Sequence, residues 1–99
     1  GYSPAAMMAD VRQAIWGTEL AGRVAIDPFR RQLQRVHVER LIAIANVEGA
    51  VTEARPLARA EMAALRSAVR NRISRGGDGT SLAHLRDIDA RITAVLEPE

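Results

Sequence analysis

The sequence predicts an all-α protein, a small up-and-down bundle of about four helices. Apolar residues recur three and four positions apart through most of the chain, which is the spacing of one face of an α-helix. Two segments open with a capping residue followed by proline, Ser3-Pro4 and Asp27-Pro28. The one alternating stretch, "RVHVER" at 35–40, lies inside a longer helical pattern, so no strand is expected. Short helices in sequence favour a bundle.

Length and composition indicate one domain over residues 1–99. A chain of 99 residues supports a single modest core, and 47% of its residues are apolar but only three are aromatic. Aliphatic side chains should therefore fill the core. The absence of cysteine excludes disulfides, thiolate zinc sites and a cysteine nucleophile. Because the first residue is glycine and not methionine, we interpret the sequence as a fragment of a longer chain.

The charges do not indicate a nucleic-acid-binding protein. All 14 basic residues are arginine, but 12 acids spread along the chain reduce the net charge to +2. A nucleic-acid-binding domain usually concentrates positive charge on one face. The chain also has no run of 18 apolar residues and no signal-peptide pattern at its start. We expect neither a nucleic-acid partner nor membrane insertion, and composition leaves the localisation open.

The first helix is predicted to run from Pro4 to about Trp16 or Leu20, with Ser3 as its N-cap. Glycines at positions 17 and 22 should weaken or end it. Its core stripe is expected to consist of Met8, Val11 and Ile15, with Met7 and Ala14 beside it.

The second helix is predicted from Pro28 to about Glu48, and Gly49 is a plausible stop. Asp27 is the clearest cap in the chain, because its carboxylate can accept a first-turn N–H and suits the positive end of the helix dipole. One broad arc of this helix is expected to face the core: Phe29, Leu33, Val36, His37, Leu41 and Ile44.

Two more helices follow. Pro56 should open the third, which ends before the glycine-rich "RGGDG" at 75–79, and Asp78 or Thr80 should cap the fourth, which ends near Pro98. Asp87 and Arg91 are spaced for an exposed ion pair within the fourth helix. The core stripes are expected to be Ala58, Met62, Leu65, Val69 and Ile73 in the third helix, and Leu85, Ile88, Ile92 and Val95 in the fourth.

The two histidines have a structural and a metal-binding interpretation. His37 lies beside the core stripe, so a buried or half-buried structural histidine is favoured, and His84 should lie near the edge of its helix's apolar face. A zinc site would need the two to meet with Glu39 or Asp87 nearby. Without an HExxH or CxxC motif we predict no metal and no cofactor in this chain.

Four arginines of the second helix and one tryptophan are candidate interdomain contacts. Arg30, Arg31 and Arg35 lie in the first turns, where the helix dipole disfavours cations, so they should be solvated, pair with acids such as Asp27, Glu19 or Glu53, or dock on another domain. Arg40 lies inside the apolar arc and should snorkel outward or pair with Glu61. Trp16 should cap the core unless it is exposed, in which case it would mark an interface.

No catalytic pattern is present. The serines have no G-x-S-x-G turn, and "GGDG" lacks the strand and lysine of a phosphate-binding loop. We therefore expect that this chain is not an enzyme.

Three segments together resemble the C-terminal helical region of large bacterial zinc-dependent metalloproteases of the met-zincin type. They are "DPFRRQLQRVHVERLIAIAN" at 27–46, "ARPLARAEMAALRSAVRNRI" at 54–73 and "SLAHLRDIDARITAVLEP" at 81–98. The resemblance covers about residues 8 to 98. Its motifs are a D-P-[FY]-R-R-x-L-Q-R-x-[YH]-[VL]-x-R-L pattern, an R-x-L-A-R-x-E-[LM]-x-x-L helix and a final H-L-x-D-[IL]-x-A-R-I helix.

The resemblance implies a non-catalytic accessory domain of a larger secreted or periplasmic zinc hydrolase. The HExxHxxGxxH motif of that family is not in this chain, so no catalytic residue carries over. The partner would be the catalytic domain of the parent protein. The matched positions would then be structural or interdomain residues: Asp27, Pro28, Arg30, Arg31, Leu33, Gln34, Arg35 and Arg40.

Three hypotheses make different structural predictions. An accessory domain should leave an apolar patch, or Arg30, Arg31 and Arg35 without intramolecular partners. A self-associating bundle should present Val38, Ile42 and Ala45 on the second side of its second helix, as an interface with a second copy. A nucleic-acid-binding domain, the weakest of the three, should align arginines on one face.

Overall fold

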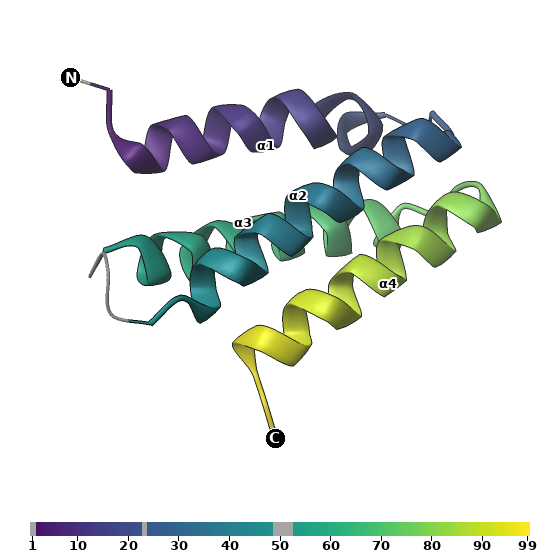
Figure 1. The fold of residues 1–99 in the computed structure, drawn as a ribbon. Coiled ribbons are helices and arrows are strands. Elements are labelled where there is room, and N and C mark those ends of the chain that lie inside the picture. The colour runs from purple at the N-terminus through teal and green to yellow at the C-terminus, as the bar shows by residue number, and fades with distance from the viewer. Residues whose placement is uncertain (1, 23, 49–52) are drawn as a thin grey trace.

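A computed structural model describes residues 2–22, 24–48 and 53–99, which form four α-helices and no strand. The helices are α1 (Pro4–Ala21), α2 (Pro28–Asn46), α3 (Ala54–Ser74) and α4 (Gly79–Leu96). Consecutive helices run in opposite directions (Figure 1). The predicted all-α up-and-down bundle is confirmed.

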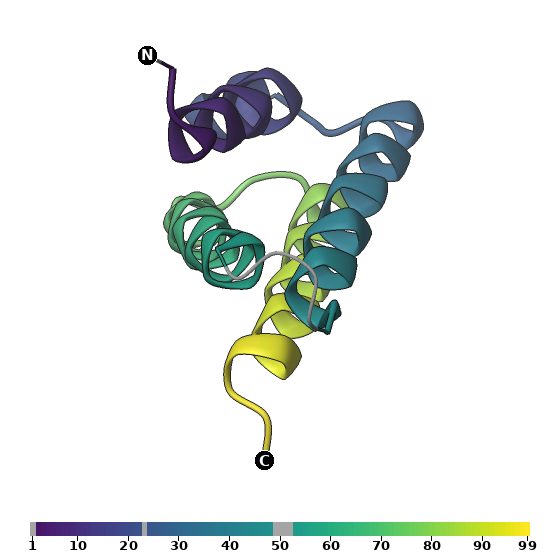
Figure 2. The same ribbon diagram turned by 60° about the vertical axis from the view of Figure 1, so that its left-hand side comes forward.

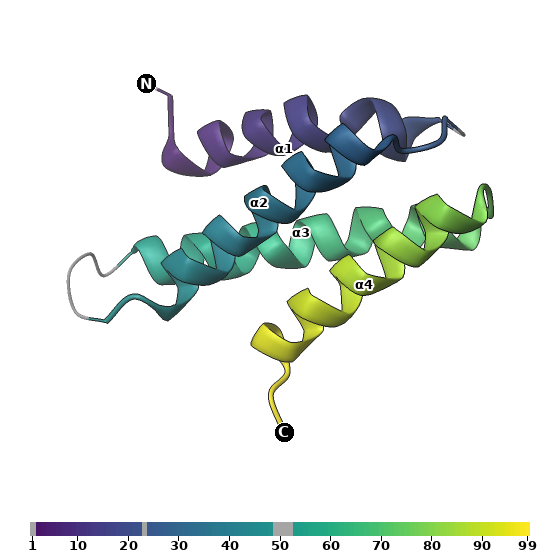
Figure 3. The ribbon, with the colours of Figure 1, turned by 45° about the vertical axis from the view of Figure 1, so that its right-hand side comes forward.

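The helix α3 has the most extensive contacts in the bundle; both α2 and α3 touch each of the other three helices, but α3 packs more extensively against α1 and α4 than α2 does. In Figure 2, α1 lies above α3, and α2 and α4 run side by side across from them. The bundle is flattened, with extents of 41 × 37 × 22 Å. Figure 3 shows that α1 and α2 approach each other near their connection and diverge toward the N-terminus of α1. No helix in the described segments is both long and apolar enough to cross a membrane.

Three of the helices begin at side-chain caps. Ser3 Oγ accepts the N–H of Ala6 at 3.1 Å, and an Asp27 oxygen accepts the N–H of Arg30 at 2.8 Å, as predicted. Asp78, and not Thr80, caps α4 by accepting the N–H of Ser81 at 2.9 Å. Asp87 and Arg91 also form the predicted i,i+4 pair, at 3.3 Å.

Helix boundaries differ from the prediction by a few residues. α1 continues through Gly17 to Ala21, because burial of Trp16 and Leu20 offsets the roughly 1 kcal/mol that glycine costs inside a helix. α2 ends at Asn46, and α3 begins at Ala54, before Pro56. The proposed stop at Gly49 lies outside the described residues.

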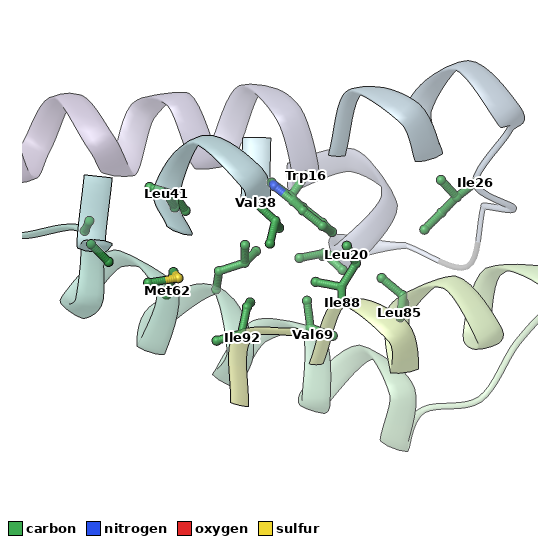
Figure 4. Packing of buried hydrophobic residues seen from close by; sticks show 13 residues of the cluster. Trp16, Leu20, Ile26, Val38, Leu41, Met62, Val69, Leu85, Ile88 and Ile92 are labelled. Atoms are coloured by element: carbon green, nitrogen blue, oxygen red, sulfur yellow. The ribbon is translucent and has the colours of Figure 1, made fainter. Parts of the chain in front are cut away.

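Thirteen buried apolar side chains from all four helices and the α1–α2 connection form the core (Figure 4). The predicted stripes of α3 and α4 are confirmed, although Ile73 and Val95 are only partly buried and pack at the margin of the core. The core residues are Trp16, Leu20, Ile26, Val38, Leu41, Ala45, Ala58, Met62, Leu65, Val69, Leu85, Ile88 and Ile92.

The predicted core faces of α1 and α2 are partly wrong. Val11 and Met7 of α1 are 47% and 52% exposed, and Phe29 and Val36 of α2 are 75% and 40% exposed. Both helices carry more apolar residues than one core face accommodates, so periodicity could not choose which side turns inward. The buried residues of the two helices are instead Trp16, Glu19, Leu20, Gln34, His37, Val38, Leu41 and Ala45.

The face of α2 that turns inward includes the residues expected to form a self-association interface. Val38 and Ala45 are buried inside the bundle, and Ile42 packs partly against the core. These three residues therefore do not form a surface for a second copy, and that prediction is wrong.

Candidate functional site

Trp16 and the two histidines form a buried cluster between α1, α2 and α4. The Trp16 indole N–H donates to His37 Nδ1 at 2.8 Å, so that nitrogen carries no proton and the neutral ring is protonated at Nε2. The His84 ring is nearly parallel to the indole, at 12° and a centroid distance of 6.4 Å. Both histidines are buried, as expected for His37, while His84 lies deeper than the edge position predicted for it.

Gln34 connects this cluster to the last turns of α1. Its amide nitrogen donates to the carbonyl of Ile15 at 3.2 Å and to the Glu19 carboxylate at 3.3 Å, while its amide oxygen lies 2.9 Å from His84 Nε2. Gln34 is fully buried, so these bonds satisfy polar atoms that water cannot reach. His84 Nδ1 is buried and has no hydrogen-bond partner among the described residues.

Burial keeps both imidazoles neutral at neutral pH. It lowers the pKa of His84 to about 4, helped by the nearby Arg35 and Arg31 and opposed by Asp87. The pKa of His37 is also lowered, first by burial and then by Arg12. The cluster thus consists of neutral groups locked by hydrogen bonds, an arrangement typical of a structural centre.

The stability of the protein is therefore expected to fall as the pH drops below the unfolded-state histidine pKa of about 6.5. The folded-state pKa of His84 is lower than that value, so its contribution is complete above pH 6.5 and is lost as the pH approaches 4. The loss from this one group is on the order of 2 to 3 kcal/mol. Urea unfolding measured at pH 7 and pH 4 checks it.

His84→Gln is the matched variant for this measurement, because glutamine adds no charge in acid. Its stability should depend less steeply on pH than that of the wild type over this interval. Identical slopes for the two proteins would show that His84 does not cause the acid sensitivity.

A second buried polar pair joins α1 to α3. Arg12 donates to Glu61 at 2.8 Å, and Glu61 is only 6% exposed. Burial raises the pKa of Glu61, and Arg12 opposes that shift. Of the two alternatives predicted for Arg40, the pair with Glu61 is wrong, because Glu61 Oε1 accepts from Arg12 of α1, while the exposure of Arg40 agrees with the outward orientation.

The candidate arginines divide into two pairs. Arg30 lies 3.4 Å from Glu19, one of the acids named for it, and Arg31 donates to the carbonyl of Ile26 at 2.6 Å. The expectation that an accessory domain would leave these two arginines without intramolecular partners is therefore wrong. Arg35 and Arg40 make no hydrogen bond or ion pair with the described residues. Trp16 is fully buried, which excludes it from an interdomain contact in this structure.

The diverging α1 and α2 leave an apolar surface groove of about 220 Å³ between them. Arg40 lines this groove and also a neighbouring hollow that contains Arg35 and Val36. The groove residues are Met7, Met8, Val11, His37, Arg40, Leu41 and Ile44. It is thus an apolar surface with one cation on its α2 side.

No family model, curated protein or solved structure matches this chain. Within the described segments, no three histidine, cysteine or acidic side chains gather as metal ligands would. The two histidines instead pack against Trp16, with ring centroids 6.3 and 6.4 Å from the indole.

Sequence reasoning missed the buried polar residues that organise the bundle. The core stripes predicted from spacing include none of four buried polar residues: Gln34, Glu19, Arg72, which is 2% exposed, and Ser81, which accepts the N–H of Ile26 at 2.8 Å. One signal was available for Gln34, since it lies three and four positions before the buried His37 and Val38. The spacing along the helix does not distinguish a buried polar residue from a polar residue exposed to solvent.

Proposed function

We propose that this chain is a non-catalytic helical accessory domain that packs against another domain of a larger protein. The observation that supports the proposal most is the apolar surface on the diverging sides of α1 and α2. Isolated exposed apolar residues are common, but a contiguous apolar groove is typical of an interaction site. Met7 and Val11 on one wall, and Ile44 on the other, form such a groove.

The charges near the groove support the same proposal. Arg35 and Arg40 have no partner in the described part of the chain, whereas Arg12 and Arg30 are paired with acids. An arginine fork binds a carboxylate with two parallel hydrogen bonds, so it is well suited to a fixed acidic partner on another domain.

The finer form of the proposal rests on the resemblance of residues 27–46, 54–73 and 81–98 to the C-terminal region of met-zincin metalloproteases. In that form, the partner is the catalytic zinc domain of the parent protein, and the location is secreted or periplasmic. The buried Trp16–His37–Gln34–His84 cluster would keep the accessory domain folded, and no residue of this chain would take part in the chemistry.

A self-associating helical domain is the alternative, since the same groove could be covered by a second copy. A nucleic-acid-binding role is disfavoured by charge pairing. Arg66, Arg70 and Arg91 are each within 3.3 Å of a carboxylate of this chain, so their charge is partly neutralised where a phosphate would have to bind.

The mass and metal content of the native gene product, purified from the source cells, test the proposal. We expect a polypeptide much heavier than 10.8 kDa, with zinc bound in a fixed ratio. A mature product near 10.8 kDa without zinc would contradict it and leave self-association as the function to test by sedimentation.

A further inference from the structure

We propose that the α1–α2 groove binds an acidic amphipathic helix, whose apolar ridge lies between the two helices and whose carboxylate pairs with Arg40. The inference rests on the proposed function, because it names the surface and the kind of partner through which the domain would pack. It is carried by the shape of the groove, by its composition and by the charges around it.

The shape of the groove fits a helix. Met7 and Val11 are four residues apart on α1, and Arg40 and Ile44 are four residues apart on α2, so each wall is an i,i+4 ridge. Helices pack by placing a side-chain ridge of one helix into a groove between side-chain ridges of its neighbours. The backbones of α1 and α2 diverge toward the N-terminus of α1 (Figures 1 and 3), and the side chains of both ridges line a surface hollow of about 220 Å³. An added helix would complete the packing of both.

The composition of the groove requires an apolar contact surface. Five of its seven lining residues are apolar, namely Met7, Met8, Val11, Leu41 and Ile44. Methionine side chains adapt their shape to an incoming surface, which suits a groove that must accept a partner's side chains. Helix-in-groove recognition uses apolar anchors three, four and seven residues apart on the partner.

The charges select an acidic partner over a neutral or basic one. Arg40 has no acid to pair with in the described chain, and the groove itself contains no carboxylate. The neighbouring Glu39 is directed to α4, where it pairs with Arg91. Arg35 and Arg40 line the adjacent hollow together with that Glu39–Arg91 pair, so the hollow contains two arginines without a partner among the described residues beside one ion pair. A carboxylate on the partner would therefore meet an unpaired guanidinium.

A designed pair of peptides tests this inference on the chain as it stands. The acidic probe is a blocked peptide of about 20 residues, long enough to form a helix, with leucines three and four positions apart and glutamates beside them. The basic probe has lysine in place of each glutamate. Fluorescence anisotropy of labelled peptides should show that the acidic probe binds at least about tenfold more tightly.

Three variants of the protein locate the binding site. Arg40→Glu should abolish or reverse the preference for the acidic probe, and Val11→Glu should weaken binding of both probes, because each changes an exposed residue of the groove. Arg86→Glu is the matched control, since it reverses an exposed charge on α4 away from the groove, and it should leave the preference unchanged. Equal thermal unfolding of the variants, followed by circular dichroism, establishes that each is folded.

Two results would overturn the inference. One is equal binding of the two probes, or a preference that Arg40→Glu does not alter. The other is a dimer of the wild-type chain that Val11→Glu converts to a monomer, which would assign the groove to a second copy. The mass and zinc content of the native product are independent of both, so a heavy zinc protein with a negative peptide result refutes the groove and not the accessory-domain proposal.

Discussion

Replacing Trp16 with alanine is expected to destabilise the protein by about 4 kcal/mol, the largest effect of any single truncation in this chain. Trp16 is fully buried, packs against both histidines and donates to His37 Nδ1 at 2.8 Å. The substitution removes the largest side chain of the core and leaves an acceptor without its donor. Since a small domain has only about 5 to 15 kcal/mol of stability, roughly a quarter to four-fifths of it would be lost. Urea unfolding followed by far-ultraviolet circular dichroism measures the change.

Trp16→Phe separates packing from hydrogen bonding. Phenylalanine keeps an aromatic ring in the cavity but cannot donate to His37, so we expect a smaller loss of about 1 to 2 kcal/mol. If the alanine variant lost less than the phenylalanine variant, Trp16 would not be the centre of the core.

Replacing Arg72 with methionine is expected to cost about 3 kcal/mol. The Arg72 side chain is buried, donates to the carbonyl of Glu19 at 3.3 Å and also donates to the carbonyl of Gly76. It thus places a cation at the negative, C-terminal end of α1 and ties the α3–α4 connection to it. Methionine would fill much of the space but leave these carbonyls without a donor.

Arg75 supplies the matched control for Arg72. It too donates to carbonyls at the end of α1, those of Leu20 and Ala21, but it is exposed, so water can replace its hydrogen bonds. Arg75→Met should therefore cost less than about 1 kcal/mol. The difference between the two free energies of unfolding measures the effect of burial, and equal losses would contradict this account.

The α3–α4 connection favours glycine at position 77, beside Arg72. Its φ of +145° is a conformation that L side chains rarely adopt, and a Cβ atom there would lie 2.8 Å from a guanidinium nitrogen of Arg72. The glycine-rich segment, which the sequence predicts as a helix break, therefore also leaves room for the guanidinium of the buried Arg72.

The sequence by itself determined the helices and half of the core. Proline after a capping residue fixed the starts of α1 and α2, because these residues satisfy the free N–H groups locally. The core faces of α3 and α4 were also correct, since each has one apolar stripe and a polar remainder, which leaves one way to turn inward. These features depend only on residues within about one helical turn of each other.

Only the tertiary structure decided which faces of α1 and α2 turn inward. That choice also determined which residues line the candidate groove. Their apolar arcs are broader than one core face, so burial of Trp16 against His37 and His84, and of Gln34 between α1 and α4, selected the inward side. The hydrogen bonds among these residues join positions 19 to 50 apart, and the stacked Trp16 and His84 are farther apart still, so no local pattern reports them. Phe29, Val36, Met7 and Val11 were left outside as a result. The physical reason is that a buried polar residue is stable only beside a specific partner, which spacing along one helix does not specify.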